Sequence, residues 1–139
     1  MADHRFELRG RFLYAGDDNK VESIDSEILT ADGWEHLQIG NDSPGFLIFV
    51  YSFLICQHTY FHANCGERGL LLERADAALS LLADGDWKIE RVEIEIEARL
   101  RGGDADAETV DYIKQRMRQC PVSINLNEPA DYRIQLEFG

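Results

Sequence analysis

The chain has 139 residues, 45% of them hydrophobic and 29% charged, which is the composition of a globular protein and not of a disordered one. Fourteen lysines and arginines against 26 acidic residues give a formal net charge of −12, which excludes a basic nucleic-acid-binding surface and disfavours binding to anionic membranes. This length predicts a single domain, residues 1–139, with a sizeable core.

The first ten residues are rich in charge and contain no apolar segment, so we expect no secretory signal there. The longest apolar run, Phe46 to Cys56, is shorter than the ~18 residues of a membrane span. We therefore expect a soluble, cytoplasmic protein. In a reducing compartment an odd number of cysteines indicates thiol chemistry or burial, not a disulfide framework. The three cysteines are Cys56, Cys65 and Cys120.

The first third of the chain predicts strands. Alternate apolar positions precede a turn cluster at Gly16–Asn19, and β-branched residues resume over Val21–Leu29. The alternating positions are Phe6, Leu8, Phe12 and Tyr14. A polar loop over Asp32–Asp42 follows, with Trp34 and Ile39 as its expected anchors.

A long helix is predicted next. Ser43 is its expected N-cap and Pro44 its first residue, and the apolar pattern runs past Phe61 to a stop at Gly66 or Gly69. Because apolar residues cover nearly all sides of the first half, we expect that half to be buried all round.

The second half of the chain combines strands with one helix. Arg74–Ala83 favours helix on propensity alone. Val92–Arg101 alternates between apolar and charged residues, as in an antiparallel strand with one solvated face, and a bulge is expected near Glu90 and Arg91. The charged side of this strand includes Glu93, Glu95 and Glu97, which read as a solvated row.

Asp104 or Asp106 is expected to cap a second helix, and Tyr132–Phe138 alternates as a final strand. The apolar stripe of the second helix is Val110, Ile113, Met117 and Cys120, so Cys120 is predicted to point inward.

Two of the cysteines occupy contrasting surroundings. Cys120 precedes Pro121, which favours the first turn of a short helix, so Cys120 is the expected N-cap and the helix dipole favours its thiolate. Cys56 lies in an apolar segment, which raises the pKa of a thiol and keeps it inert. Two buried cysteines that merely fill a core are the alternative interpretation.

The order of N-terminal strands, a long apolar helix with a central cysteine, a strand block and a helix ending in Cys-Pro-Val resembles the OsmC/Ohr superfamily. These are the osmotically inducible protein C and organic hydroperoxide resistance proteins. The resemblance runs from Ser43 to the C-terminus. The residues that carry it are Phe53 to Cys56, Glu67 to Leu70, Ile89 to Leu100 and Cys120 to Ser123.

The resemblance implies an α+β fold, with antiparallel sheet and a long central helix, in an intertwined homodimer that has its thiol sites at the interface. It makes Arg74–Ala83 a strand, against its local propensity. It also implies that Cys56 is the peroxidatic residue, Cys120 the resolving residue, an organic hydroperoxide the substrate and an external dithiol the reductant.

One part of the family pattern is not matched. Peroxidases of this family place a glutamate in a Pro-Glu-Glu or Pro-Glu-Gln segment at the helix start, where it orients an activating arginine. The segment from Ser43 to Leu47 contains no acid. Arg9 and Arg11 are the candidates for the arginine by location.

A second set of residues, His58, His62 and Cys65, falls at i, i+4 and i+7 on one face of the long helix. The favoured interpretation is a partly exposed polar face. The same spacing suits metal ligands, and histidine-assisted thiol chemistry is a third interpretation. Because no fourth ligand is evident nearby, we predict no metal and no cofactor. Cys65 lies half a turn from Cys56, so these two thiols are not expected to meet.

The leading functional hypothesis is a thiol-dependent, peroxidase-like redox protein that uses Cys56 and Cys120. The alternative is a non-catalytic protein that binds a small apolar ligand and retains its cysteines as core residues. Sulfurs of Cys56 and Cys120 near disulfide reach, with a cation close to Cys56, favour the enzyme. A dry pocket without a cation favours the binding protein.

Overall fold

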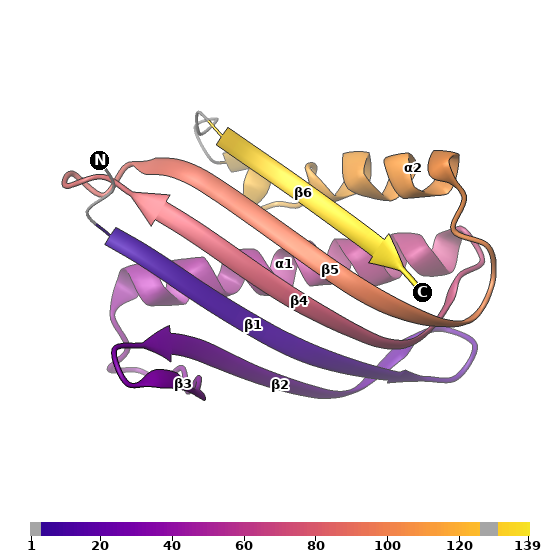
Figure 1. Ribbon diagram of the computed structural model, residues 1–139, viewed down its shortest axis with the longest axis horizontal. Helices are drawn as coiled ribbons and strands as arrows, with labels where there is room; N and C mark the ends of the chain where they lie inside the picture. Colours follow the sequence, from indigo (N-terminus) through magenta and orange to yellow (C-terminus); the bar gives the residue numbers. More distant parts are fainter. Residues whose placement is uncertain (1–3, 126–130) are drawn as a thin grey trace.

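One six-stranded sheet carries both helices on the same face in the described part of the chain, residues 4–125 and 131–139 of a computed structural model (Figure 1). The strand order is β3-β2-β1-β4-β5-β6. The α+β fold with a long helix is therefore confirmed. In chain order the elements are β1 (His4–Ala15), β2 (Lys20–Thr30), β3 (Gly33–His36), α1 (Gly45–Glu67), β4 (Leu71–Ala83), β5 (Ile89–Gly102), α2 (Ala107–Met117), a 3-10 turn (Ser123–Asn125) and β6 (Asp131–Phe138).

The sheet is mixed, which corrects the expectation of a purely antiparallel one. Each pair from β3 to β5 is antiparallel, but β5 and β6 pair in parallel. The reason is that α2 lies between them in the chain. It returns the backbone to the starting end of β5, so that β6 runs in the same direction.

The strands follow the predicted alternation. In β1, Leu8, Phe12 and Tyr14 are buried on the helix side of the sheet, as expected. The expected bulge also occurs, because the register between β4 and β5 shifts opposite Glu90. The core lies between the sheet and the two helices. Its largest fully buried side chains are Leu8, Phe12, Phe53, Leu54, Phe61, Leu70, Leu72, Leu79, Leu81, Ile94, Ile96 and Ile113.

The segment Arg74–Ala83 lies within strand β4, as the family resemblance implied, and its helix propensity is overridden. It pairs with β1 on one side and β5 on the other. Every second residue from Ala75 to Ala83 is buried. Small and branched side chains in a period of two fit a central strand, so tertiary pairing decides against local preference here.

The loop over Asp32–Asp42 is anchored differently from the prediction. It contains the short edge strand β3, and its buried residue is Leu37. Trp34 and Ile39, the expected anchors, are each 37% exposed. Trp34 lies on the outer face, with the Arg9 guanidinium 4.1 Å from its ring centre, so a cation–π contact replaces burial.

Helix α1 begins one residue later than predicted and is covered on only one side. Pro44 is the N-cap, while the Ser43 hydroxyl accepts a hydrogen bond from the Gly40 N–H instead. The side of α1 that faces away from the sheet is open to solvent, and Ile48 on that side is 39% exposed. All-round burial is therefore wrong for the single chain. By length and composition alone α1 could span a membrane, which is weak evidence, and its sheet-facing side buries Val50, Phe53, Leu54 and Phe61.

Helix α2 begins as predicted and ends earlier. Asp106 is the N-cap, and its carboxylate accepts a hydrogen bond from the Thr109 N–H at 2.8 Å. Ile113 and Met117 are buried. The helix ends at Met117, so Cys120 follows it and is also buried.

The β1–β2 turn is fixed by a buried asparagine. Asn19 is fully buried with a left-handed φ of 53°. Its side chain donates to the Leu70 carbonyl and accepts from the Leu72 N–H, both at 2.8 Å. It thus joins the first hairpin to the start of β4, where the chain leaves α1.

We expect Asn19→Ala to lower the free energy of unfolding by roughly 2–3 kcal/mol, because two buried backbone groups lose their partner. Alanine also tolerates the left-handed φ poorly. Urea unfolding measures the change. Asp18→Ala, at an exposed neighbouring position, is the control and should cost little. A loss for Asn19→Ala no larger than the control's would contradict this role.

Candidate functional site

The predicted cysteine pair comes together in the fold. Cys56 lies in the middle of α1 and is half-buried, whereas Cys120 follows α2 and is fully buried. The Cys56 thiol lies close enough to the Cys120 thiol and to the backbone of Val122 for both to affect its pKa. Both cysteines are free thiols in this structure.

Hydrogen-bond donors surround the Cys120 sulfur. The Gln57 side-chain amide donates to Cys120 Sγ at 3.0 Å, and the Ser123 backbone N–H donates to it at 3.3 Å. The Cys120 thiol lies 3.1 Å from the Ser123 hydroxyl. The bond from Ser123 N–H is the one expected of an N-cap, although the helix it caps is only one 3-10 turn.

Burial and, to a smaller extent, the adjacent Cys120 thiol raise the pKa of Cys56 to about 11, although the backbone of Val122 acts in the opposite direction. No cationic side chain in the described ranges contributes to lowering this pKa. Arg118 lies over the Tyr132 ring, 4.7 Å from its centre, and does not contribute to the pKa of Cys56. The Cys56 thiol is therefore almost entirely protonated at neutral pH.

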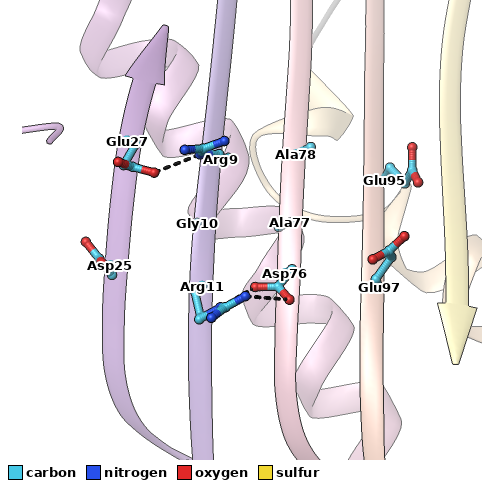
Figure 2. Close-up of a pocket in the computed structure, with 10 residues that line it drawn as sticks. All are labelled: Arg9, Gly10, Arg11, Asp25, Glu27, Asp76, Ala77, Ala78, Glu95 and Glu97. Carbon is cyan, nitrogen blue, oxygen red and sulfur yellow. Dashed lines mark hydrogen bonds and ion pairs between the residues drawn. The ribbon is translucent and has the colours of Figure 1, made fainter. Parts of the chain in front are cut away.

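The two arginines expected near the thiols lie elsewhere. Arg9 and Arg11 alternate with the buried residues of β1 and therefore point away from α1. On that outer face Arg9 pairs with Glu27 and Arg11 with Asp76, each at 2.7 Å (Figure 2). Neither can activate Cys56, which corrects the assignment by location.

The outer face of the sheet contains a second candidate site, a shallow hollow of about 610 Å³. The small residues Gly10, Ala77 and Ala78 lie between the charged side chains that border it (Figure 2). Glu95 and Glu97 lie on one side, and their carboxylates come within 4.8 Å of each other and of a third acid, Glu137. Glu95 and Glu97 belong to the expected solvated row, and the described residues that line the hollow include no cysteine or histidine.

The histidines of α1 stack on each other, with His58 buried and His62 half-buried, so the partly exposed polar face that was favoured holds for His62 alone of the three residues. His58 is 3% exposed, stacks on Phe12 and shares a 2.5 Å hydrogen bond with the Tyr14 hydroxyl. His62 stacks on His58, and Cys65 is fully buried. Among the described residues, these three do not form a set with ligand atoms within 4.8 Å of one another. Their arrangement is that of packed core residues.

Burial, together with the neighbouring His62, lowers the pKa of His58 to about 3. Burial raises the pKa values of Tyr14 and Cys65. Cys65 therefore stays protonated, on the sheet side of α1 and away from the thiol pair, as the sequence predicted.

Two residues of the site were not anticipated. Gln57 is a fully buried amide next to Cys56, and its position on the apolar face of α1 was the available signal. Tyr132, from β6, hydrogen-bonds the Ser123 hydroxyl at 2.8 Å. Nothing local in the sequence predicts that contact, because it depends on where β6 joins the sheet.

No protein-family model matches the sequence, and no curated protein matches it. Solved structures do match it in fold. One is an OsmC-like hydroperoxide resistance protein from Jannaschia sp. CCS1, with a TM-score of 0.57 and 12% identity over 87% of this chain and 85% of that chain. Another is an OsmC-like protein from Mycoplasma pneumoniae, with a TM-score of 0.52 and 8% identity over 99% and 97% of the two chains. The OsmC-like fold implied by the resemblance is confirmed.

Because His58 is neutral in the folded protein and protonates when unfolded, the stability it provides is present above pH 6.5 and is lost as the pH falls towards 3. We expect this residue to contribute up to about 1.4 kcal/mol per pH unit to that loss. In His58→Gln the contribution should disappear. Urea unfolding at pH 7, 6 and 5 tests this, with the exposed His36→Gln as control. Parallel pH profiles for all three proteins would refute the assignment.

Proposed function

Since the chain has the OsmC-like fold and holds Cys56 against Cys120, we propose that it is a thiol-dependent redox protein that reduces organic hydroperoxides. The observation that supports this most directly is the meeting of two cysteines from α1 and from the segment after α2. The OsmC-like relative named for hydroperoxide resistance supports the choice of substrate. The proposal treats residues 1–139 as one domain and the protein as cytoplasmic.

In the oxidative half of the cycle, the Cys56 thiolate attacks one peroxide oxygen. The O–O bond breaks, the leaving alkoxide takes a proton to become an alcohol, and Cys56 becomes a sulfenic acid. The Cys120 sulfur then attacks the Cys56 sulfur, and the hydroxyl leaves as water. The resulting disulfide is reduced by an external dithiol, which supplies the two electrons.

The chain's own contribution to the first step is modest. The Val122 N–H stabilises charge on the Cys56 sulfur, but burial holds the pKa of Cys56 at about 11. The rate of attack therefore follows the small thiolate fraction. It should rise about ten-fold for each pH unit below that pKa. Because the side chain of Cys56 is half-buried and that of Cys120 is fully buried, Cys56 is the thiol that a hydroperoxide can reach.

The first test of this cycle is intact-protein mass after treatment with an organic hydroperoxide at pH 8.5. The wild-type protein should lose about 2 Da as the disulfide forms. Cys120→Ser should gain about 16 Da for the sulfenic acid and about 32 Da under excess peroxide. Cys56→Ser should show neither change.

Cys65→Ser is the matched control, because its thiol is buried on the other side of α1 and should leave the wild-type result unchanged. Repeating the measurement at pH 7.5 should slow the oxidation about ten-fold. A wild-type mass that hydroperoxide does not change, with all three thiols still titratable, would exclude the peroxidase.

One observation favours a second candidate function. The described residues place no cation against Cys56, whose pKa is raised, and such a thiol suits a binding pocket as well as a reactive site. In this alternative the protein binds a small apolar ligand beside α1, and the cysteines are packing residues. The mass measurement separates the two, because only the peroxidase loses about 2 Da.

We also propose that the protein is a homodimer through the open side of α1. That side carries small and apolar residues, and an apolar surface left uncovered by one sheet is the kind that a second copy covers. Exposed or half-exposed residues on it are Gly45, Ile48, Ser52, Ile55, Thr59 and Ala63. Cys56 lies at its border, so the dimer places the thiols beside the interface.

Sedimentation at micromolar concentration should show twice the 15.9 kDa of one chain. Ile48→Asp should shift the protein towards monomer, because it places a charge in the interface. Leu13→Asp is the matched control, since both positions are 39% exposed but Leu13 lies on the outer face of the sheet. A compact wild-type monomer would remove this proposal.

A further inference from the structure

Gln57 is a fully buried amide that connects α1 to the segment carrying Cys120. Its nitrogen shares its two hydrogens among three acceptors, which are the Met117 carbonyl and the Ser123 hydroxyl, both at 2.8 Å, and Cys120 Sγ at 3.0 Å. Its side-chain oxygen has no hydrogen-bond partner within the described residues. The nitrogen thus carries all the bonds that this side chain makes.

A purely structural role explains Gln57 poorly. The Met117 carbonyl also accepts the Cys120 N–H at 3.2 Å, and the Ser123 hydroxyl also bonds Tyr132 at 2.8 Å. Both groups therefore have other partners. The unpaired, buried oxygen is a cost that an apolar side chain of the same size would avoid. What such a side chain could not supply is an N–H directed at the Cys120 sulfur.

Donors directed at a sulfur stabilise negative charge on it. Cys120 Sγ accepts hydrogen bonds from the Gln57 amide and the Ser123 N–H, whereas among the described residues the Val122 backbone is the one group that lowers the pKa of Cys56. The two thiols also differ in access, because Cys120 is fully buried and Cys56 is not. In thiol–disulfide exchange, attack is favoured at the accessible sulfur, and the sulfur better stabilised as a thiolate leaves.

We propose that Gln57 is a positioning residue that makes Cys120 the leaving thiolate when an external dithiol reduces the disulfide. This rests on the proposed function, since it concerns the second half of that cycle. One thiolate of the dithiol attacks Cys56 Sγ and forms a mixed disulfide there. The Cys56–Cys120 bond breaks, and its electron pair stays on Cys120 Sγ. The second thiol of the reductant then attacks the reductant sulfur that is bonded to Cys56, which closes the reductant's own disulfide and releases Cys56.

The test starts from disulfide made with diamide, so that it does not depend on peroxide. The equilibrium constant for reduction by dithiothreitol is compared between wild type and Gln57→Met, which is nearly isosteric and has no donor. We expect the constant of the variant to fall roughly ten-fold at pH 9 and much less at pH 6, since the lost bond acts on the thiolate.

Asn64→Leu is the matched control. Asn64 is also buried on α1 and also meets α2, through Arg116, but its side chain bonds no sulfur. For Asn64→Leu, the ratio of the wild-type equilibrium constant to that of the variant should be the same at pH 6 and pH 9. If the ratio of the equilibrium constants of wild type and Gln57→Met does not change with pH, the substitution causes only a packing defect and the proposal is overturned.

The site of attack is measured separately with the monothiol glutathione. Peptide mapping of trapped wild-type protein should place the adduct on Cys56, and an adduct on Cys120 would overturn the proposal. If diamide produces the disulfide and hydroperoxides do not, the proposed function fails while the role of Gln57 is still measured. If diamide produces no disulfide, the pair cannot exchange and the inference about Gln57 fails as well.

Discussion

The first half of helix α1 is apolar on nearly every side, and in a single chain the sheet and α2 leave one side of the helix uncovered. The long strands around β1 and β4 supply part of the cover, and their inward side chains form the core with Phe53, Leu54 and Phe61. Cys56 lies where the covered and open sides meet, which makes it half-buried while Cys120 is fully enclosed. The boundary between the covered and open sides of α1 thus determines that a solute can approach Cys56 and not Cys120.

Within residues 4–125 and 131–139, charge is distributed so that no cationic side chain lowers the pKa of Cys56. Most arginines of the sheet, such as Arg9 and Arg11, pair with acids on its outer face. Exposed pairs of this kind contribute little to stability, so they chiefly keep the outer face soluble. Neutral amides face the sulfurs instead, from Gln57 and the backbone of Val122 and Ser123. Such dipoles stabilise a thiolate more weakly than an arginine would, and salt affects them less.

The spacing of apolar residues predicted most of the fold, because a strand or helix that buries one side has apolar residues at regular intervals in the sequence. The alternation of β1, β5 and β6 and the cap at Asp106 are of this kind. The strand β4 was predicted only through the family resemblance, since its alanines and leucines suit a helix until neighbouring strands pair with them. Asn19 and the Tyr14–His58 pair have no local signal, because their partners lie far along the chain.

The parallel pairing of β5 with β6 makes the thiol site depend on the last strand. Cys120 lies in the connection between these strands, and Tyr132 of β6 holds Ser123 beside it. Contacts between parts so distant in sequence form late, because the intervening chain must first close as a loop. During synthesis, Cys56 leaves the ribosome well before the residues that enclose Cys120. A nascent chain therefore carries Cys56 on α1 without its partner thiol in place until the C-terminal strand has docked.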